Sequence, residues 1–268
     1  MIDWVKDEER DVEFCTYFIE SSRSKNVTGD MSKPSKAYSW IEQHLHTDKM
    51  ASFDITSVSG LCMNYYTTDH HWNYRGSYKG YKEIMELLGR GKAVQQPIGT
   101  QTFPVVFNGS LAKAVKDPMS QEYFTVYRFQ NVPGYTSYVN GKKKAYDGIS
   151  RYNAYRYSTD AYTDHYSSYY GSNQVAEVIL DTGNDRQKDL LVITNSFGVP
   201  VIEMLAMHYN RVISINLRYY REQMGKDFNL TEYLNSYDIS QVLILGDFTL
   251  YCYPDTFGEA KDDDMVAR

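Results

Sequence analysis

The sequence is poor in cysteine and contains no long apolar run. Its 268 residues include three cysteines, Cys15, Cys62 and Cys252, whose spacing matches no metal-binding pattern. An odd number cannot pair completely, so we expect reduced thiols and no disulfide framework. The chain has no stretch of about 20 apolar residues to cross a membrane, and the charged residues 1–14 do not resemble a secretory signal.

Positive charge is also scarce. The 28 Lys and Arg residues are outnumbered by 34 Asp and Glu residues, which gives a net charge of −6, and no basic stripe is present. We therefore expect no nucleic-acid partner. The lysine run in residues 141–146 is short and is interpreted as a hairpin turn.

Length and composition indicate an ordinary globular protein, with 42% hydrophobic and 23% charged residues. No repeat or long linker divides the chain, so one domain is predicted over residues 1–268. The chain opens in charged sequence without an obvious first element. This is compatible with a fragment that lacks an N-terminal export or anchor segment.

The apolar pattern changes twice along the chain. Helices are expected at residues 36–46, with Ser35 as the N-cap, and from near Gly76 to Gly89. Residues 102–170 are typical of strands and turns. From residue 174 onward, apolar strands alternate with helices, which predicts an α/β fold with a parallel sheet flanked by helices and an inserted β-rich middle. The expected strands of this last part are 174–180, 189–194, 211–217 and 241–248, and its expected helices are 199–209 and 231–237.

Proton-transfer groups are concentrated in four consecutive residues, Asp69, His70, His71 and Trp72. A carboxylate on one imidazole nitrogen fixes the tautomer and leaves the other nitrogen free to accept a proton. Asp69 and His71 could therefore form a general base with its orienting acid. Such a base needs a nucleophile to serve.

Ser196 is the candidate nucleophile. It follows the apolar strand at 189–194 and precedes Pro200, which suits the first turn of a helix. The carboxyl end of a strand is the usual ligand-binding edge of an α/β sheet, and a helix N-terminus there stabilises a developing oxyanion. The local string TNSFG is not the Gly-x-Ser-x-Gly elbow of α/β-hydrolases. In isolation such a serine is more often a simple N-cap.

Other interpretations of these residues stay open. The two adjacent histidines could simply anchor a loop through hydrogen bonds. A metal site could be formed by Asp69, His70, His71, Asp164 and His165, because these are good borderline ligands. Adjacent histidines on a loop rarely point the same way, so we expect no metal and no other cofactor.

Tyrosine is unusually dense in residues 152–170, which hold seven. Such a surface suits carbohydrate recognition, with flat rings under sugar faces. The alternative is a β-rich region that uses tyrosine as half-buried strand filler. Residues 246–248, GDF, are interpreted only as the end of a core strand.

Three segments resemble one family. Residues Thr68 to Tyr81, TDHHWNYRGSYKGY, resemble the signature of the DHHW protein family, which is related to the alginate O-acetyltransferases and the wider SGNH-hydrolase superfamily. Residues 189–220 resemble its nucleophile segment, and residues 166–174, YSSYYGSNQ, resemble its block containing glycine and asparagine. The three motifs occur in the family's order and span most of the chain.

The resemblance implies a flavodoxin-like α/β fold with a Ser-His-Asp triad in which the Asp-x-His motif precedes the serine. By position, Asp69 would orient His71, His71 would be the base and Ser196 the nucleophile. His70 and Trp72 would be supporting residues.

The same resemblance assigns substrate or oxyanion contacts to Arg218, Asn173, Gly171 and Tyr170. Two positions depart from the family. Asn195 stands where relatives usually have an aspartate, and Ser172 stands where many have a second glycine. Both departures leave the triad intact but alter the polarity and space beside it.

The function implied by the resemblance is serine-dependent acyl transfer, O-acetyl transfer above all, to or from a cell-wall or extracellular polysaccharide. The expected partners are the polysaccharide, an acyl donor and a membrane-bound acyl-transfer protein, and the expected location is outside the cytoplasm. The alternative is a non-catalytic glycan-binding or assembly protein on the same scaffold.

Overall fold

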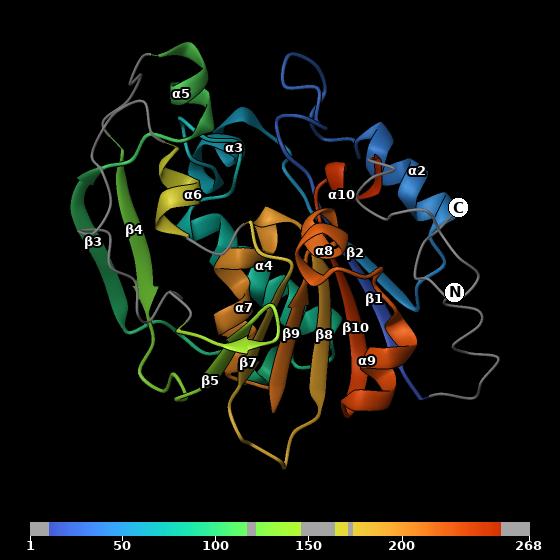
Figure 1. Cartoon of the computed structure of the whole chain (residues 1–268). Helices are drawn as coiled ribbons and strands as arrows, with labels where there is room; N and C mark the ends of the chain where they lie inside the picture. Colours follow the sequence, from blue (N-terminus) through green and yellow to red (C-terminus); the bar gives the residue numbers. More distant parts are fainter. Residues whose placement is uncertain (1–10, 117–121, 146–163, 171–173, 253–268) are drawn as a thin grey trace.

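An eight-stranded sheet forms the centre of the molecule (Figure 1). The computed structural model describes residues 11–116, 122–145, 164–170 and 174–252. The strand order is β2-β1-β10-β8-β9-β7-β5-β6; neighbours from β2 to β9 are parallel, and β7, β5 and β6 pair antiparallel. The strands are β1 (Glu13–Ile19), β2 (Lys49–Phe53), β5 (Thr136–Val139), β6 (Lys142–Lys143), β7 (Glu177–Asp181), β8 (Asp189–Thr194), β9 (Arg211–Ile215) and β10 (Ile239–Gly246).

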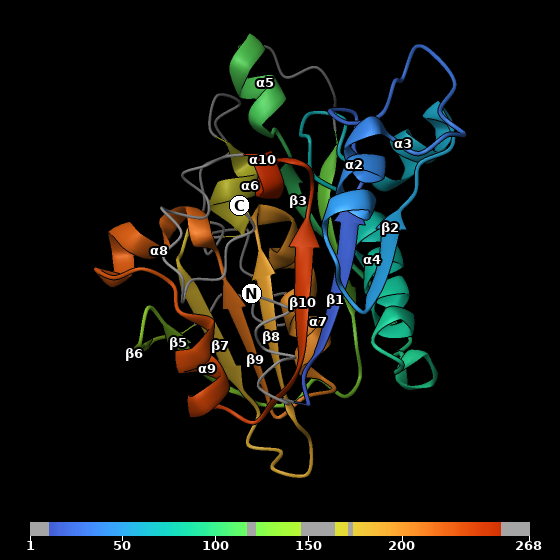
Figure 2. The ribbon, with the colours of Figure 1, turned by 90° about the vertical axis from the view of Figure 1, so that its right-hand side faces the viewer.

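Helices cover both faces of this sheet, and Figure 2 shows α4 on one side and α8 and α9 on the other. Leu191 and Val192 are consecutive in β8, yet they belong to two different buried clusters because successive side chains of a strand point to opposite faces. This double burial explains the unbroken apolar run at residues 190–193 of the strand. The helices are α2 (Lys36–His44), α3 (Val58–Asn64), α4 (Tyr74–Leu87), α5 (Ser110–Val115), α6 (His165–Tyr169), α7 (Val199–Ala206), α8 (Leu217–Met224), α9 (Leu230–Ser236), α10 (Thr249–Cys252) and the short 3₁₀ turns η1 (Gly91–Ala93) and η4 (Ser196–Gly198).

Side-chain caps set the starts of the two predicted N-terminal helices. Oγ of Ser35 accepts a hydrogen bond from the backbone N–H of Tyr38 at 3.1 Å, which confirms Ser35 as the cap of α2. α4 begins at Tyr74, before the predicted start, because Oδ1 of Asn73 accepts from the N–H groups of Arg75 and Gly76. The residues preceding α4 are therefore fixed by the helix itself.

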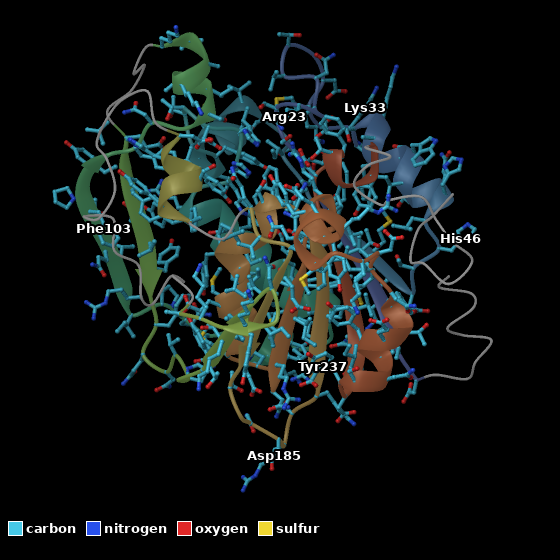
Figure 3. All side chains as sticks on the ribbon, in the orientation of Figure 1. Arg23, Lys33, His46, Phe103, Asp185 and Tyr237 are labelled. Atoms are coloured by element: carbon cyan, nitrogen blue, oxygen red, sulfur yellow. The ribbon has the colours of Figure 1, made fainter. Side chains whose placement is uncertain are left out.

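The β-rich middle is present and is divided between two sheets. β3 (Gly99–Val106) and β4 (Tyr123–Arg128) form a separate antiparallel pair, in which Phe103, labelled in Figure 3, packs on Phe124. β5 and β6 instead extend the main sheet. Residues 164–170, predicted within this strand-rich region, form the helix α6 and its flanks. The rest of the tyrosine-rich run, residues 152–163, lies outside the described ranges.

Two features of the sheet differ from the prediction. β1 and β2 lie in a part of the sequence where no strand was predicted, and β1 is inserted between β2 and β10. β7 was predicted in a parallel sheet but runs antiparallel to β9, because an apolar run carries no information about strand direction.

None of the helices in the described residues is long and apolar enough to cross a membrane. Cys15 is buried and Cys62 is exposed, and both are free thiols. This agrees with the expected reduced state for these two residues.

Candidate active site

Ser196 lies at the carboxyl end of β8, beside the carboxyl ends of the parallel neighbours β9 and β10. The strand ends at Thr194, and Ser196 begins η4, which continues into α7 with Pro200 in its first turn. The serine is partly exposed, although the strand before it and the helix after it are buried. In Figure 3, Arg23 lies toward this end of the molecule and Asp185, in the turn before β8, lies at the opposite end.

The structure brings Asp69, His71 and Ser196 into contact. Nδ1 of His71 lies 2.5 Å from Oδ1 of Asp69, and Nε2 of the same ring lies 2.6 Å from Oγ of Ser196. The carboxylate favours the tautomer with its proton on Nδ1, so the lone pair of Nε2 faces the serine hydroxyl. Two segments separated by 125 positions therefore form one continuous hydrogen-bonded chain.

Asp69 is buried and held by backbone donors. Its Oδ1 also accepts from the N–H of His71 at 2.9 Å, and its Oδ2 accepts from the N–H of Ser110 at 2.7 Å. Burial alone would raise the pKa of Asp69, but the charge and hydrogen bonds of His71, with the Ser110 N–H, hold that pKa well below its usual value. Gly109 leaves the necessary room, since a Cβ there would lie 2.4 Å from Oδ2. Asp69 is therefore ionised at neutral pH.

His70 lies beside His71, with 3.9 Å between the ring centroids, and its Nδ1 is 3.0 Å from Oγ of Ser110. Burial, and then the charge of His71, lowers the pKa of His70 to about 3; Asp69 opposes this shift and the positive charge of Arg23 adds to it. His70 is thus neutral at physiological pH. Its hydrogen bond ties it to the same loop that holds Asp69.

The lowered pKa of His70 predicts an effect on stability. Unfolding returns the residue to its ordinary pKa, so the unfolded chain binds a proton between pH 6.5 and 3 that the folded chain does not, and stability falls as the pH is lowered through this window. We expect His70→Gln, which cannot titrate, to lose about 2 kcal/mol less stability than the wild type between pH 7 and pH 5. Urea unfolding at both pH values measures this, with the exposed His46→Gln as the control. Equal losses in the wild type and His70→Gln would contradict the burial of a neutral imidazole.

Trp72 anchors the loop that carries His71. Its side chain is fully buried and meets Phe53 and Phe197 edge to face, at 5.5 and 5.9 Å between centroids. α4 accommodates the indole at Gly80, where a Cβ would lie 2.4 Å from the ring. The predicted supporting role of Trp72 is therefore accounted for by packing.

Tyr166, on α6, was not singled out from the sequence. Its ring is parallel to that of His71, at 3.7 Å between centroids and 5° between planes, and its hydroxyl donates to the carbonyl oxygen of Ser196 at 2.8 Å. Nothing in the local sequence distinguishes Tyr166 from the other tyrosines of this run. It lies in the block at residues 166–174 that resembles the family, but the substrate contact predicted there was Tyr170.

Asn195 and Asp247 form a contact that the sequence interpretation did not identify. Nδ2 of Asn195 donates to Oδ1 of Asp247 at 2.8 Å, and Oδ1 of Asn195 accepts from the N–H of Phe197 at 3.2 Å. Asp247 is fully buried just after β10, so our interpretation of residues 246–248 as a plain strand end was incomplete. An aspartate at position 195 would place a second carboxylate against Asp247, and the amide avoids this repulsion.

The predicted substrate and oxyanion residues are not all brought to this site. Arg218 is exposed on α8, and its guanidinium lies over the ring of Tyr219. Tyr170 is buried and packs against Tyr166 and Phe124, which leaves little of its ring for a substrate. Gly171 and Asn173 lie outside the described residues. Substrate contacts of these four residues stay predictions.

Three of the five residues considered as metal ligands lie close together. Ligand atoms of Asp69, His70 and His71 lie within 4.8 Å of one another. Nδ1 of both rings is, however, already engaged, with Ser110 for His70 and with Asp69 for His71. Nδ1 of His165 accepts from a backbone N–H at 2.8 Å and is likewise engaged. The hydrogen bonds therefore favour proton transfer over metal binding.

No family model and no curated protein matches the sequence. Solved structures do share the fold. Bacillus cereus PatB1 is 18% identical with a TM-score of 0.65, over 92% of this chain and 86% of that one. The same protein with a sulfonyl adduct is 18% identical with a TM-score of 0.63, over 92% and 84%. A DHHW family protein from Eubacterium siraeum is 16% identical with a TM-score of 0.61, over 93% and 80%. The chain thus has the α/β fold of a solved DHHW family protein, as the resemblance predicted.

Proposed function

We propose that this protein catalyses acyl transfer through Ser196, with His71 as the general base and Asp69 as the residue that orients it. The observation that carries the proposal is the distance of 2.6 Å between Nε2 of His71 and Oγ of Ser196, with the ionised Asp69 on the other ring nitrogen. Nucleophile, base and orienting acid in mutual hydrogen-bond reach are the recognised signature of serine catalysis.

The reaction follows from this geometry in two halves. Nε2 of His71 takes the hydroxyl proton as Oγ of Ser196 forms a bond to the acyl carbonyl carbon. The tetrahedral intermediate collapses, the bond to the leaving group breaks, and that group takes the proton from the imidazolium. In the second half a sugar hydroxyl gives its proton to the same nitrogen and attacks the carbonyl carbon of the acyl-serine. The bond to Oγ then breaks, Oγ takes the proton back from the imidazolium, and the sugar ester is released.

We expect the charges that develop in the transition state to be stabilised both at His71 and at the acyl oxygen. The imidazolium is paired with Asp69, which is buried and therefore interacts strongly. We expect the developing oxyanion to lie near the N-terminus of α7, where the helix dipole favours negative charge. The N–H groups of Phe197 and Gly198 already donate to Asn195.

A polysaccharide hydroxyl is the proposed acceptor, and an extracytoplasmic location goes with it. The resemblance of residues 68–81 and 189–220 to the DHHW family supports this assignment. PatB1 has also been solved with a sulfonyl adduct, and we propose that Ser196 is the residue that a sulfonyl reagent would modify here. The membrane-bound acyl-transfer partner belongs to the same proposal.

The test uses 4-nitrophenyl acetate as the acyl donor, followed by mass spectrometry of the intact protein and its peptides. We expect a transient gain of one acetyl group on Ser196, prevented by prior treatment with a sulfonyl fluoride. Adding an N-acetylglucosamine oligomer then distinguishes the two outcomes of deacylation: acetylated sugar indicates a transferase, and free acetate alone indicates an esterase. A protein that binds the oligomer but never acetylates Ser196 would be a glycan-binding module, and the enzyme proposal would be wrong.

A further inference from the structure

Tyr166 contacts both residues that exchange the proton in the proposed reaction. Its ring covers one face of the His71 imidazole at 3.7 Å, and its hydroxyl donates to the carbonyl oxygen of Ser196 at 2.8 Å. The side chain is 1% exposed, so both contacts are made in a water-poor environment.

The position of Tyr166 is fixed by the loop that also holds Asp69. The backbone N–H of His165 donates to the carbonyl oxygen of Asn108 at 2.9 Å, and Nδ1 of His165 accepts from the N–H of Asn108 at 2.8 Å. Two residues further on, the N–H of Ser110 donates to Asp69. The helix carrying Tyr166 and the backbone donor that supports the orienting acid are therefore joined through the same loop.

Parallel stacking restricts what the imidazole can do. A ring held only by hydrogen bonds at its two nitrogens can still tilt about the line that joins them, and such a tilt would turn the lone pair of Nε2, which lies in the ring plane, away from the Ser196 hydroxyl. Tyr166 blocks the tilt from one face, and Phe197, at 4.7 Å, packs at 51° on the ring. The charged and titratable groups around the imidazole are Asp69 at Nδ1 and His70 beside the ring.

The stack also acts on charge. When His71 takes the proton, the imidazolium lies against the electron-rich face of the phenol ring, an arrangement that is attractive for a cation and stronger when water is excluded. The neutral imidazole gains less from the same contact. Tyr166 therefore favours the proton-transfer state over the ground state, which is the condition for an effect on rate.

We propose that Tyr166 is a positioning residue for acyl transfer: its ring aligns and stabilises the imidazole of His71 while its hydroxyl fixes the backbone of Ser196. The inference rests on the proposed function, because it concerns the same proton transfer. It adds a fourth residue, from a different segment, to the three that the sequence predicts.

Three variants test this inference. Tyr166→Leu removes the ring face, Tyr166→Phe keeps the ring and removes only the hydroxyl, and Tyr169→Leu removes a fully buried ring from the same helix that packs on Phe124 and His165. The acylation rate, kcat and KM are measured with 4-nitrophenyl acetate, and thermal unfolding is recorded for each protein. Should Tyr166→Leu fail to fold, Tyr166→Met takes its place, because methionine fills an irregular gap flexibly.

For Tyr166→Leu we expect acylation and kcat to fall roughly tenfold with KM unchanged, since the residue contacts the base and not the substrate. Tyr166→Phe should acylate only about threefold more slowly than the wild type, because it retains the stacked ring and loses only the hydrogen bond to Ser196. Tyr169→Leu should lose thermal stability to a similar degree but keep its acylation rate. Equal rate losses in Tyr166→Leu and Tyr169→Leu would reduce Tyr166 to a packing residue. A rate for Tyr166→Phe as low as that of Tyr166→Leu would show that the ring does not act on the imidazole, and either result would overturn the inference. The wild-type acetylation of Ser196 tests the proposed function separately.

Discussion

Replacing Ser196 with alanine is expected to reduce turnover of 4-nitrophenyl acetate by roughly 10⁵- to 10⁶-fold, to the level that binding and oxyanion stabilisation alone provide. The hydroxyl is the atom that would form the acyl bond, and the substitution leaves His71 with no proton to take. Steady-state release of nitrophenol measures the loss, and the acetyl label on the 189–220 segment should vanish with it.

The fold should survive this substitution. Ser196 is partly exposed, and its hydroxyl makes one recorded hydrogen bond, to His71. We expect thermal unfolding close to that of the wild type, and retained binding of any glycan that the native protein binds. Ser59→Ala, at an exposed position of α3, is the matched control and should keep full turnover. Undiminished turnover in Ser196→Ala would place the chemistry on another residue.

The second large effect is expected for Asp69→Asn, which should lower kcat by about ten-thousand-fold. The carboxylate accepts from Nδ1 of His71, so it sets the tautomer that leaves Nε2 free for the Ser196 proton. An asparagine can instead donate to Nδ1, which selects the opposite tautomer and turns Nε2 into a donor. It also removes the negative charge that stabilises the imidazolium.

A buried aspartate elsewhere separates this effect from a loss of stability. Asp189 is fully buried at the start of β8, the end opposite to Ser196, where it accepts from Asn210 and from the N–H of Asp238. Asp189→Asn should weaken the fold and keep kcat within a few-fold of the wild type. If Asp69→Asn and Asp189→Asn lost activity to the same extent, Asp69 would be a structural residue only.

Features that depend on residues close together in the sequence could be predicted from it. Ser35 was recognisable as a cap because a serine before an apolar helix pattern satisfies free N–H groups. The pair formed by Asp69 and His71 was recognisable because a carboxylate two residues before an imidazole can fold back on it, as it does here. The apolar run of β8 likewise marked a doubly buried strand and hence the sheet edge on which Ser196 lies.

What the sequence did not predict depends on contacts between distant segments. The importance of Asp247 emerges only when β10 is known to lie beside β8, and an apolar strand pattern is the same wherever the strand sits in the sheet. Tyr166 is one of many tyrosines, and only the docking of α6 on the Asn108 loop selects it. The antiparallel direction of β7 was inaccessible for the same reason.

The central place of β10 has a consequence for how the protein is made. β1 and β8 are joined only through β10, and Oγ1 of Thr194, beside the nucleophile, donates to the carbonyl oxygen of Leu245 within it. Until β10 has been synthesised, the facing edges of β1 and β8 lack their partner, and unpaired strand edges of this kind invite mispairing. The proposed nucleophile therefore gains its finished surroundings only once residues 239–246 have been synthesised.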